Sequence, residues 1–181
     1  MSLFKRTIQP YWHLVLLKNN PEDTSYSPAL CTLGLLSLVL VLTGQWRFSN
    51  FDFSNDLLLV FCVALSLVFS IMVYTGVLLF LRGLKTRCIQ TLSSLSYTQS
   101  IIHLLSMPLL LLDPYVSALE MRNSWSLFIG IAYLLLVFLL SLWQFVVTSH
   151  IYKHALSATS IQGVLAAFGL MAANILTLSF W

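Results

Sequence analysis

Long apolar runs separated by short polar turns dominate the pattern along the chain. Five intervals contain no Asp, Glu, Lys or Arg, and they cover about residues 26–46, 57–81, 88–112, 125–149 and 157–179. Each is long enough to cross a bilayer, which takes about 20 helical residues. The apolar residues are continuous and do not alternate with polar ones, as they do in the strands of a membrane barrel. The pattern predicts an all-α fold: a polytopic integral membrane bundle of five transmembrane helices, in a single membrane domain over residues 1–181.

Residues 1–23 form a polar-leaning segment before the first interval. Pro10 suits the first turn of a helix, and the apolar run after it is too short to span a bilayer. We expect a cytoplasmic or interfacial segment whose short helix holds Tyr11 and Trp12 at the level of the lipid headgroups.

The composition strengthens the membrane assignment. Hydrophobic residues make up 59% of the 181 residues and charged residues only 8%, against about 25% charged in an ordinary soluble domain. A soluble protein of this composition lacks the charged side chains to cover its surface. The lipid bilayer is therefore the expected partner, and binding to nucleic acid is not expected.

The positions of Lys and Arg predict the orientation. With a cytoplasmic N-terminus, the basic residues on that side are Lys5, Arg6, Lys18, Arg82, Lys85, Arg87 and Lys153, and those on the other side are Arg47 and Arg122. This excess places the N-terminus inside and the C-terminus outside. The aromatic residues near the ends of the intervals are consistent with this arrangement, because Trp and Tyr gather at both membrane–water interfaces. These are Trp46, Trp125 and Trp181 at outer ends, and Trp12 and Tyr152 at inner ends.

The third interval, residues 88–112, is unusually rich in hydroxyl and amide side chains. They cover little more than half of a helical wheel, so we expect a central helix whose polar face meets protein alone, or protein and water. The candidate polar intramembrane face comprises Ser93, Ser96, Tyr97, Gln99, Ser100 and His103. Pro108 is predicted to kink this span, and Asp113 with Pro114 to end it.

Small residues four apart predict where helices approach closely. Such pairs are Ser66 with Ser70, Ser96 with Ser100, Gly163 with Ala167, and Gly169 with Ala173. They predict that the second, third and fifth spans contact one another most closely.

Several polar side chains inside the spans are candidates for chemistry. His103 is interpreted as a neutral imidazole hydrogen-bonded to a serine or a backbone carbonyl of the next helix, with a proton relay or ligand contact as the alternative. His150 and His154 are four residues apart, but a metal site needs three or four ligands, so headgroup contacts are favoured. No metal or cofactor is predicted. The amides interpreted as interhelical hydrogen-bonding groups are Gln99, Gln144 and Asn174.

The sequence contains no HExxH, GxSxG or P-loop motif, which disfavours an enzyme. The leading hypothesis is a non-enzymatic membrane protein that acts through helix–helix association, with other membrane subunits or with itself, as an assembly, scaffold or trafficking partner. The alternative is a small transporter or channel subunit with a polar path along the third span.

The layout also carries a family resemblance. It combines an N-terminal segment with a proline, five spans, a basic turn before the third span, and a run from Pro108 to Leu112 that closes that span. In these features, and in the pattern from Tyr97 to Leu112, the chain resembles the Yip family, five-helix membrane proteins that associate with Rab GTPases in eukaryotes. The long acidic region and the Tyr-Gly-Pro motif of the eukaryotic members are missing. The resemblance therefore implies a bacterial-type relative in the inner membrane, and no functional residue is carried over.

Overall fold

The computed structural model describes residues 3–48, 56–118 and 124–181, and every regular element in them is a helix. In chain order these are α1 (Leu3–Val15), η1 (Pro21–Asp23), α2 (Pro28–Arg47), α3 (Leu57–Leu81), η3 (Lys85–Arg87), α4 (Cys88–Ser117), α5 (Ser124–Ala155) and α6 (Ser160–Leu178). Five of them, α2 to α6, are long and apolar enough to cross a membrane. The chain is therefore an all-helical, multi-pass membrane protein, as the pattern predicts.

Side-chain caps explain where several of these helices begin. The Ser27 hydroxyl accepts a hydrogen bond from the amide of Leu30, directly before Pro28. The Asp56 carboxylate caps the first turn of α3. Thr159 and Gln162 form a reciprocal capping box at the start of α6. Each cap satisfies amide groups that have no partner within the helix.

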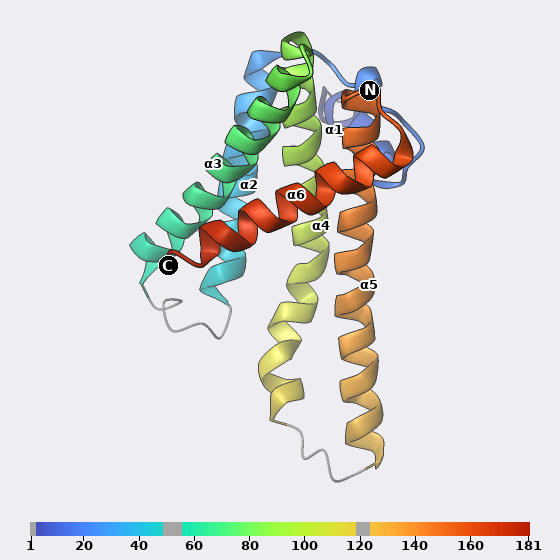
Figure 1. Cartoon of the computed structure of the whole chain (residues 1–181). Coiled ribbons are helices and arrows are strands. Elements are labelled where there is room, and N and C mark those ends of the chain that lie inside the picture. Colours follow the sequence, from blue (N-terminus) through green and yellow to red (C-terminus); the bar gives the residue numbers. More distant parts are fainter. Residues whose placement is uncertain (1–2, 49–55, 119–123) are drawn as a thin grey trace.

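Helix α4 is longer than predicted. It continues through Pro108 and through Asp113 and Pro114 to Ser117, so the prediction that Asp113 and Pro114 end the helix is wrong. A proline removes one backbone donor but keeps a helical φ, so the other backbone hydrogen bonds can continue the helix past it. Figure 1 shows that α4 bends along its lower half.

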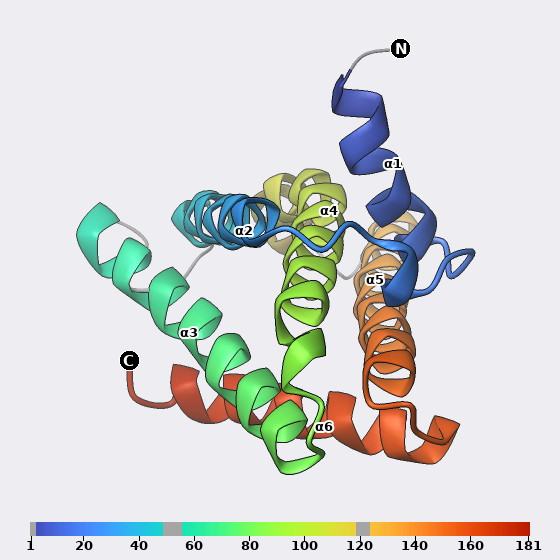
Figure 2. The ribbon, with the colours of Figure 1, turned by 90° about the horizontal axis from the view of Figure 1, so that it is seen from above.

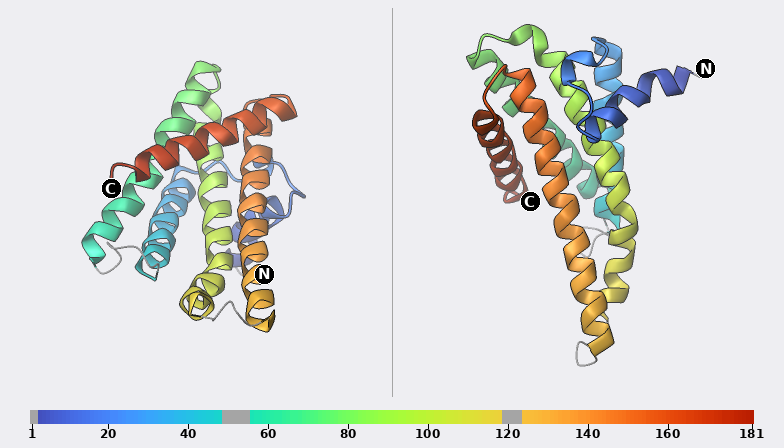
Figure 3. Two further views of the ribbon diagram at one scale, coloured as in Figure 1. Left: turned by 60° about the horizontal axis from the view of Figure 1, so that its bottom comes forward. Right: turned by 90° about the vertical axis from the view of Figure 1, so that its right-hand side faces the viewer.

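Helix α4 is the central helix of the bundle, as predicted. It contacts α1, α2, α3 and α5, and it lies between α2 and α5 in the view from above (Figure 2). Helix α6 crosses the bundle obliquely from the end of α5 to α3, which Figure 3 shows from two further sides.

The predicted pairing of the second, third and fifth spans is wrong. Helix α4 packs most closely on α2, and α6 on α5. A Cβ atom at Gly34 in α2 would lie 2.9 Å from Cε2 of Tyr97, and one at Gly163 would lie 2.8 Å from the backbone oxygen of Ser149 in α5. Gly34, which belongs to no predicted pair, and Gly163, which belongs to one, therefore allow these two close approaches.

The basic residues of the described part gather at one end of the bundle. That end holds α1, the end of α3, the start of α4 and the end of α5 (Figure 1). Arg47, by contrast, lies at the far end of α2, and Arg122 lies outside the described residues. The compartment that each end faces remains a prediction.

Three aromatic or proline positions differ from prediction. Pro10 lies inside α1 and not in its first turn. Tyr11 is only 1% exposed, so it does not face the headgroups, whereas Trp12 is exposed. Tyr152 is fully buried, and its hydroxyl lies 2.8 Å from the Thr75 hydroxyl. These rings pack inside the protein because α1 and α5 turn them toward α4 and α3.

Candidate ligand-binding cavity

The polar face of α4 divides into two parts. In the first half, Ser93 is fully buried and donates to the carbonyl of Ile89 at 2.6 Å. Ser100 donates to the carbonyl of Ser96 and lies 3.2 Å from the hydroxyl of Ser37 in α2. The Ser96 hydroxyl has no partner, but it packs near Gly34 and lines none of the cavities described below. In this half, the described hydroxyls pack against protein.

The helix α1 covers this first half through a pair of tyrosines. The rings of Tyr11 and Tyr97 stack with centroids 4.3 Å apart and planes 25° apart. Burial raises the pKa of Tyr11 to about 12, with the nearby Tyr97 adding to the rise and the Ser93 hydroxyl opposing it. The phenol of Tyr11 is therefore kept protonated where it packs.

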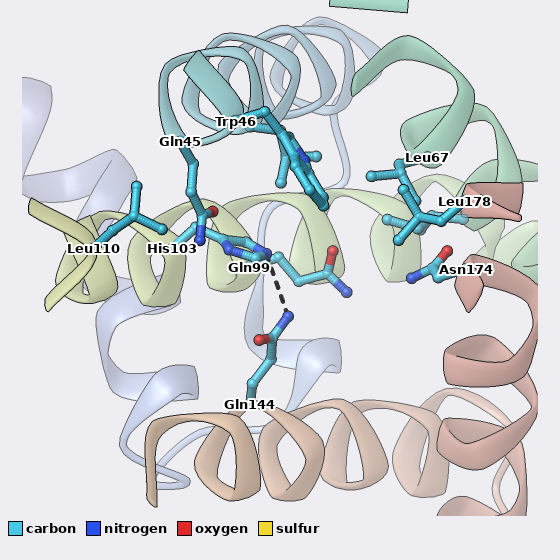
Figure 4. Close-up of a pocket in the computed structure, with 11 residues that line it drawn as sticks. Gln45, Trp46, Leu67, Gln99, His103, Leu110, Gln144, Asn174 and Leu178 are labelled. Atoms are coloured by element: carbon cyan, nitrogen blue, oxygen red, sulfur yellow. Dashed lines mark hydrogen bonds between the residues drawn. The ribbon is translucent and has the colours of Figure 1, made fainter. Parts of the chain in front are cut away.

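The second half of the polar face opens into a cavity of about 270 Å³ between the helices. We call it the amide cavity, defined by its polar lining residues Gln45, Gln99, His103, Gln144 and Asn174. They come from α2, α4, α5 and α6, and the remaining lining residues are Leu42, Trp46, Leu67, Ile71, Leu110 and Leu178. Figure 4 shows Gln45 beside His103, the amide of Gln99 pointing toward Asn174, and the ring of Trp46 above them.

Two adjoining cavities extend the amide cavity along both sides of α5. One, of about 250 Å³, lies between α4 and α5 and shares Gln45, His103 and Gln144 with it. The other, of about 270 Å³, lies between α5 and α6 and shares Gln99, Gln144 and Asn174. Met171 and Ile175, which line the second one, are more than half exposed. An exposed apolar rim between α5 and α6 therefore lies next to the amide cavity.

The polar groups of the amide cavity are only partly paired. Nε2 of Gln144 lies 3.4 Å from Nε2 of His103. Because an amide nitrogen can only donate, this contact makes the His103 nitrogen an acceptor and places the ring proton on Nδ1. The predicted partner of His103 was a serine or a backbone carbonyl, and the structure shows an amide. Oε1 of Gln45 and Oδ1 of Asn174 are buried and have no hydrogen-bond partner in the described part of the chain.

A second polar region lies at the basic end of the bundle. The guanidinium of Arg87 donates to the carbonyl of His154 at 3.1 Å and to the hydroxyl of Ser157 at 2.9 Å, and it pairs with the Glu22 carboxylate at 3.0 Å. Gln90 donates to the carbonyls of Glu22 and Thr24. We call these five residues and Thr24 the Arg87 cluster. It ties the turn before α2 to the start of α4 and the end of α5.

The paired histidines lie beside this cluster. The rings of His150 and His154 are 4.6 Å apart, and Nε2 of His150 lies 3.2 Å from the carbonyl oxygen of Asn19. Among the described residues, no group of three or more His, Cys, Asp or Glu could hold a metal ion. The absence of a metal or a cofactor remains a prediction.

The structure brings together only part of the predicted face. Gln99 and His103 reach the amide cavity, whereas Ser93, Ser96, Tyr97 and Ser100 do not line it. The sequence pattern did not lead us to predict Gln45 as a site residue. Its position, as an amide near the end of an apolar interval, could have indicated it. It also assigned Gln99, Gln144 and Asn174 to interhelical bonding, and only Gln144 makes such a bond here.

Comparison with protein-family models, with curated proteins and with solved structures finds no match to this chain. The resemblance to the Yip family therefore remains a prediction.

Proposed function

We propose that this membrane protein acts by binding a small molecule or lipid, without covalent chemistry, in the amide cavity. The observation that carries this proposal is the pair of buried, unpartnered amide oxygens, Gln45 Oε1 and Asn174 Oδ1, that belong to one cavity. An unsatisfied buried acceptor costs about 1–3 kcal/mol. A bound molecule that donates to both oxygens recovers that cost, which gives the cavity a reason to be occupied.

The arrangement of the cavity suits this role. Polar groups from four helices converge in a largely apolar pocket, which is the usual composition of a small-molecule site. Amides and a neutral imidazole orient a ligand by hydrogen bonds. The proposal is closest to the alternative drawn from the sequence, a transporter or channel subunit, with the polar region confined to the second half of α4.

Association with other membrane subunits, the leading sequence hypothesis, rested on the pairs of small residues. The described contacts of Gly34, Gly163 and Gly169 are made inside the chain, against Tyr97, Ser149 with Lys153, and Tyr74. At these glycines the chain therefore meets its own helices, which makes them a weak basis for proposing a second protein as partner. Association, the inner-membrane location and the cytoplasmic N-terminus remain predictions.

The test is native mass spectrometry of the full chain after gentle extraction from its membrane. The wild type is expected to carry a non-covalent adduct of a few hundred daltons. In Gln99→Phe, a large ring fills the centre of the amide cavity, and the adduct is expected to be lost. Gln9→Met is the matched control, because Gln9 is exposed on α1, pairs with His13 and does not line the amide cavity.

Two results would count against binding in the amide cavity. One is a wild-type protein without any adduct. The other is an adduct retained by Gln99→Phe at the wild-type level. A co-purifying polypeptide in place of a small adduct would favour association.

A further inference from the structure

The lining of the amide cavity is uncharged. Its polar residues are four amides and one histidine, and all its other lining residues are apolar. Placing an ion among such groups without a counter-charge is very costly. If the proposed binding function holds, on which this inference rests, the ligand presents an uncharged group to the cavity.

The orientation of Gln45 follows from its neighbour Ser106. The Ser106 hydroxyl donates its one proton to the carbonyl of His103 at 2.8 Å. Its oxygen can therefore only accept from Gln45, whose Nε2 lies 3.5 Å away. This chemistry directs the amide nitrogen toward Ser106 and leaves Oε1 as the unpartnered atom.

Both unpartnered atoms are amide oxygens, which accept hydrogen bonds, so a ligand pairs with them through its own donor groups. Oε1 of Gln45 belongs to α2 and Oδ1 of Asn174 to α6, and both helices line the amide cavity. Hydroxyl groups can donate to them, whereas a ketone, an ester or an ether cannot. The ligand therefore needs hydrogen-bond donors but no charge.

The apolar rim beside the amide cavity indicates what kind of molecule bears these donor groups. The adjoining cavity between α5 and α6 has exposed Met171 and Ile175 at its rim, and both belong to an apolar span. An apolar chain lying there stays in contact with the bilayer. We infer that the amide cavity takes the hydroxyl head group of an uncharged lipid, such as a monoacylglycerol, whose chain leaves between α5 and α6.

Three probes with the same oleoyl chain test this inference by native mass spectrometric titration of the delipidated full chain. They are 1-monooleoylglycerol, its 2,3-dimethyl ether, and oleoyl lysophosphatidic acid. We expect the diol to bind the wild type at least tenfold more tightly than the other two. Gln45→Met and Asn174→Leu should each weaken binding of the diol about tenfold, the value of one hydrogen bond of ordinary strength, and Gln9→Met should not.

The controls keep a folding defect apart from a binding defect. Asn174→Leu removes one unsatisfied acceptor, and Gln45→Met removes the other together with the long 3.5 Å contact to Ser106. Each puts an apolar side chain of similar size in place of the amide. Thermal unfolding should therefore show both to be at least as stable as the wild type. Unchanged binding of the diol in these stable variants would overturn the inference.

Other outcomes separate this inference from the binding function. Equal affinity for the ether, or tighter binding of the anionic lipid, would overturn the hydroxyl assignment and leave binding in the cavity intact. Binding of none of the three probes would also overturn it. The binding function itself fails only if the native adduct is absent or survives Gln99→Phe.

Discussion

The Arg87 cluster and the amide cavity use polar groups in opposite ways. In the Arg87 cluster, a guanidinium meets a carboxylate, a hydroxyl and a backbone carbonyl, and the amide of Gln90 reaches two further carbonyls. In the amide cavity, two amide oxygens have no hydrogen-bond donor among the residues that the structure describes. The first region joins segments that are distant in sequence. The second leaves two hydrogen-bond acceptors unpaired, which lowers the stability of the ligand-free protein. The comparison separates paired polar groups, which join segments of the fold, from the two unpartnered amide oxygens of the amide cavity, to which the proposed ligand would donate.

The largest expected effect comes from breaking the Arg87 cluster. Arg87→Met removes the ion pair and the hydrogen bonds to the end of α5, and we expect the free energy of unfolding to fall by about 2–3 kcal/mol. Thermal or detergent-induced unfolding measures this change. Arg82→Met is the matched control: it removes a nearby exposed charge and should change stability by less than about 0.5 kcal/mol. Equal losses in the two variants would show that charge alone matters at this end.

The contact that positions α6, and with it Asn174, gives the next effect. In Gly163→Ala, the new Cβ meets the backbone oxygen of Ser149 at 2.8 Å. Because a backbone atom cannot turn aside, we expect a loss of about 2 kcal/mol. Gly76→Ala is the control, since nothing lies within 4 Å of a Cβ there. If Gly163→Ala unfolds at the wild-type temperature, α5 and α6 are not in the close contact described.

The same substitution in the two regions should have opposite signs. Gln90→Met removes two hydrogen bonds from the Arg87 cluster and should destabilise the ligand-free protein by about 1–2 kcal/mol. Gln45→Met removes an unsatisfied acceptor from the amide cavity and loses only one long contact, 3.5 Å to the Ser106 hydroxyl, so it should be neutral or stabilising by up to about 1 kcal/mol. Unfolding of the two variants under identical conditions makes the comparison. A loss of stability in both would mean that Gln45 is a structural residue.

The smallest effect concerns the tyrosine pair that covers the first half of α4. The pKa of Tyr11 is raised to about 12, so the folded state holds its proton more tightly than the unfolded chain, in which the pKa is about 10. The resulting stability is fully present below pH 10 and is lost as the pH rises from 10 toward 12. By pH 10 the wild type should already have lost about 0.4 kcal/mol relative to pH 8. Tyr11→Phe should lack this component, and an identical pH profile in both proteins would contradict the burial of the phenol.

The spans were predictable because they depend on composition alone. The interval 57–81 coincides with α3, and the first interval ends within one residue of α2. The end of α4 was not predictable from Asp113 and Pro114, because the cost of a proline depends on how well the flanking turns are held. The amide cavity was half predictable: Gln99 and His103 stand out in a polar span, whereas Gln45 is a single amide in an apolar one.

By itself, the sequence determined that the chain is a helical membrane protein, where its spans lie, and that the helix with the polar face is central. These follow from bilayer thickness and from the cost of exposing hydroxyls to lipid. Only the tertiary structure decided which polar groups are satisfied and which face a cavity. That outcome depends on the rotation of each helix about its axis. Close contacts between helices, such as Gly34 against Tyr97 and Gly163 against Ser149, restrict this rotation, and a pattern along one helix does not reveal them.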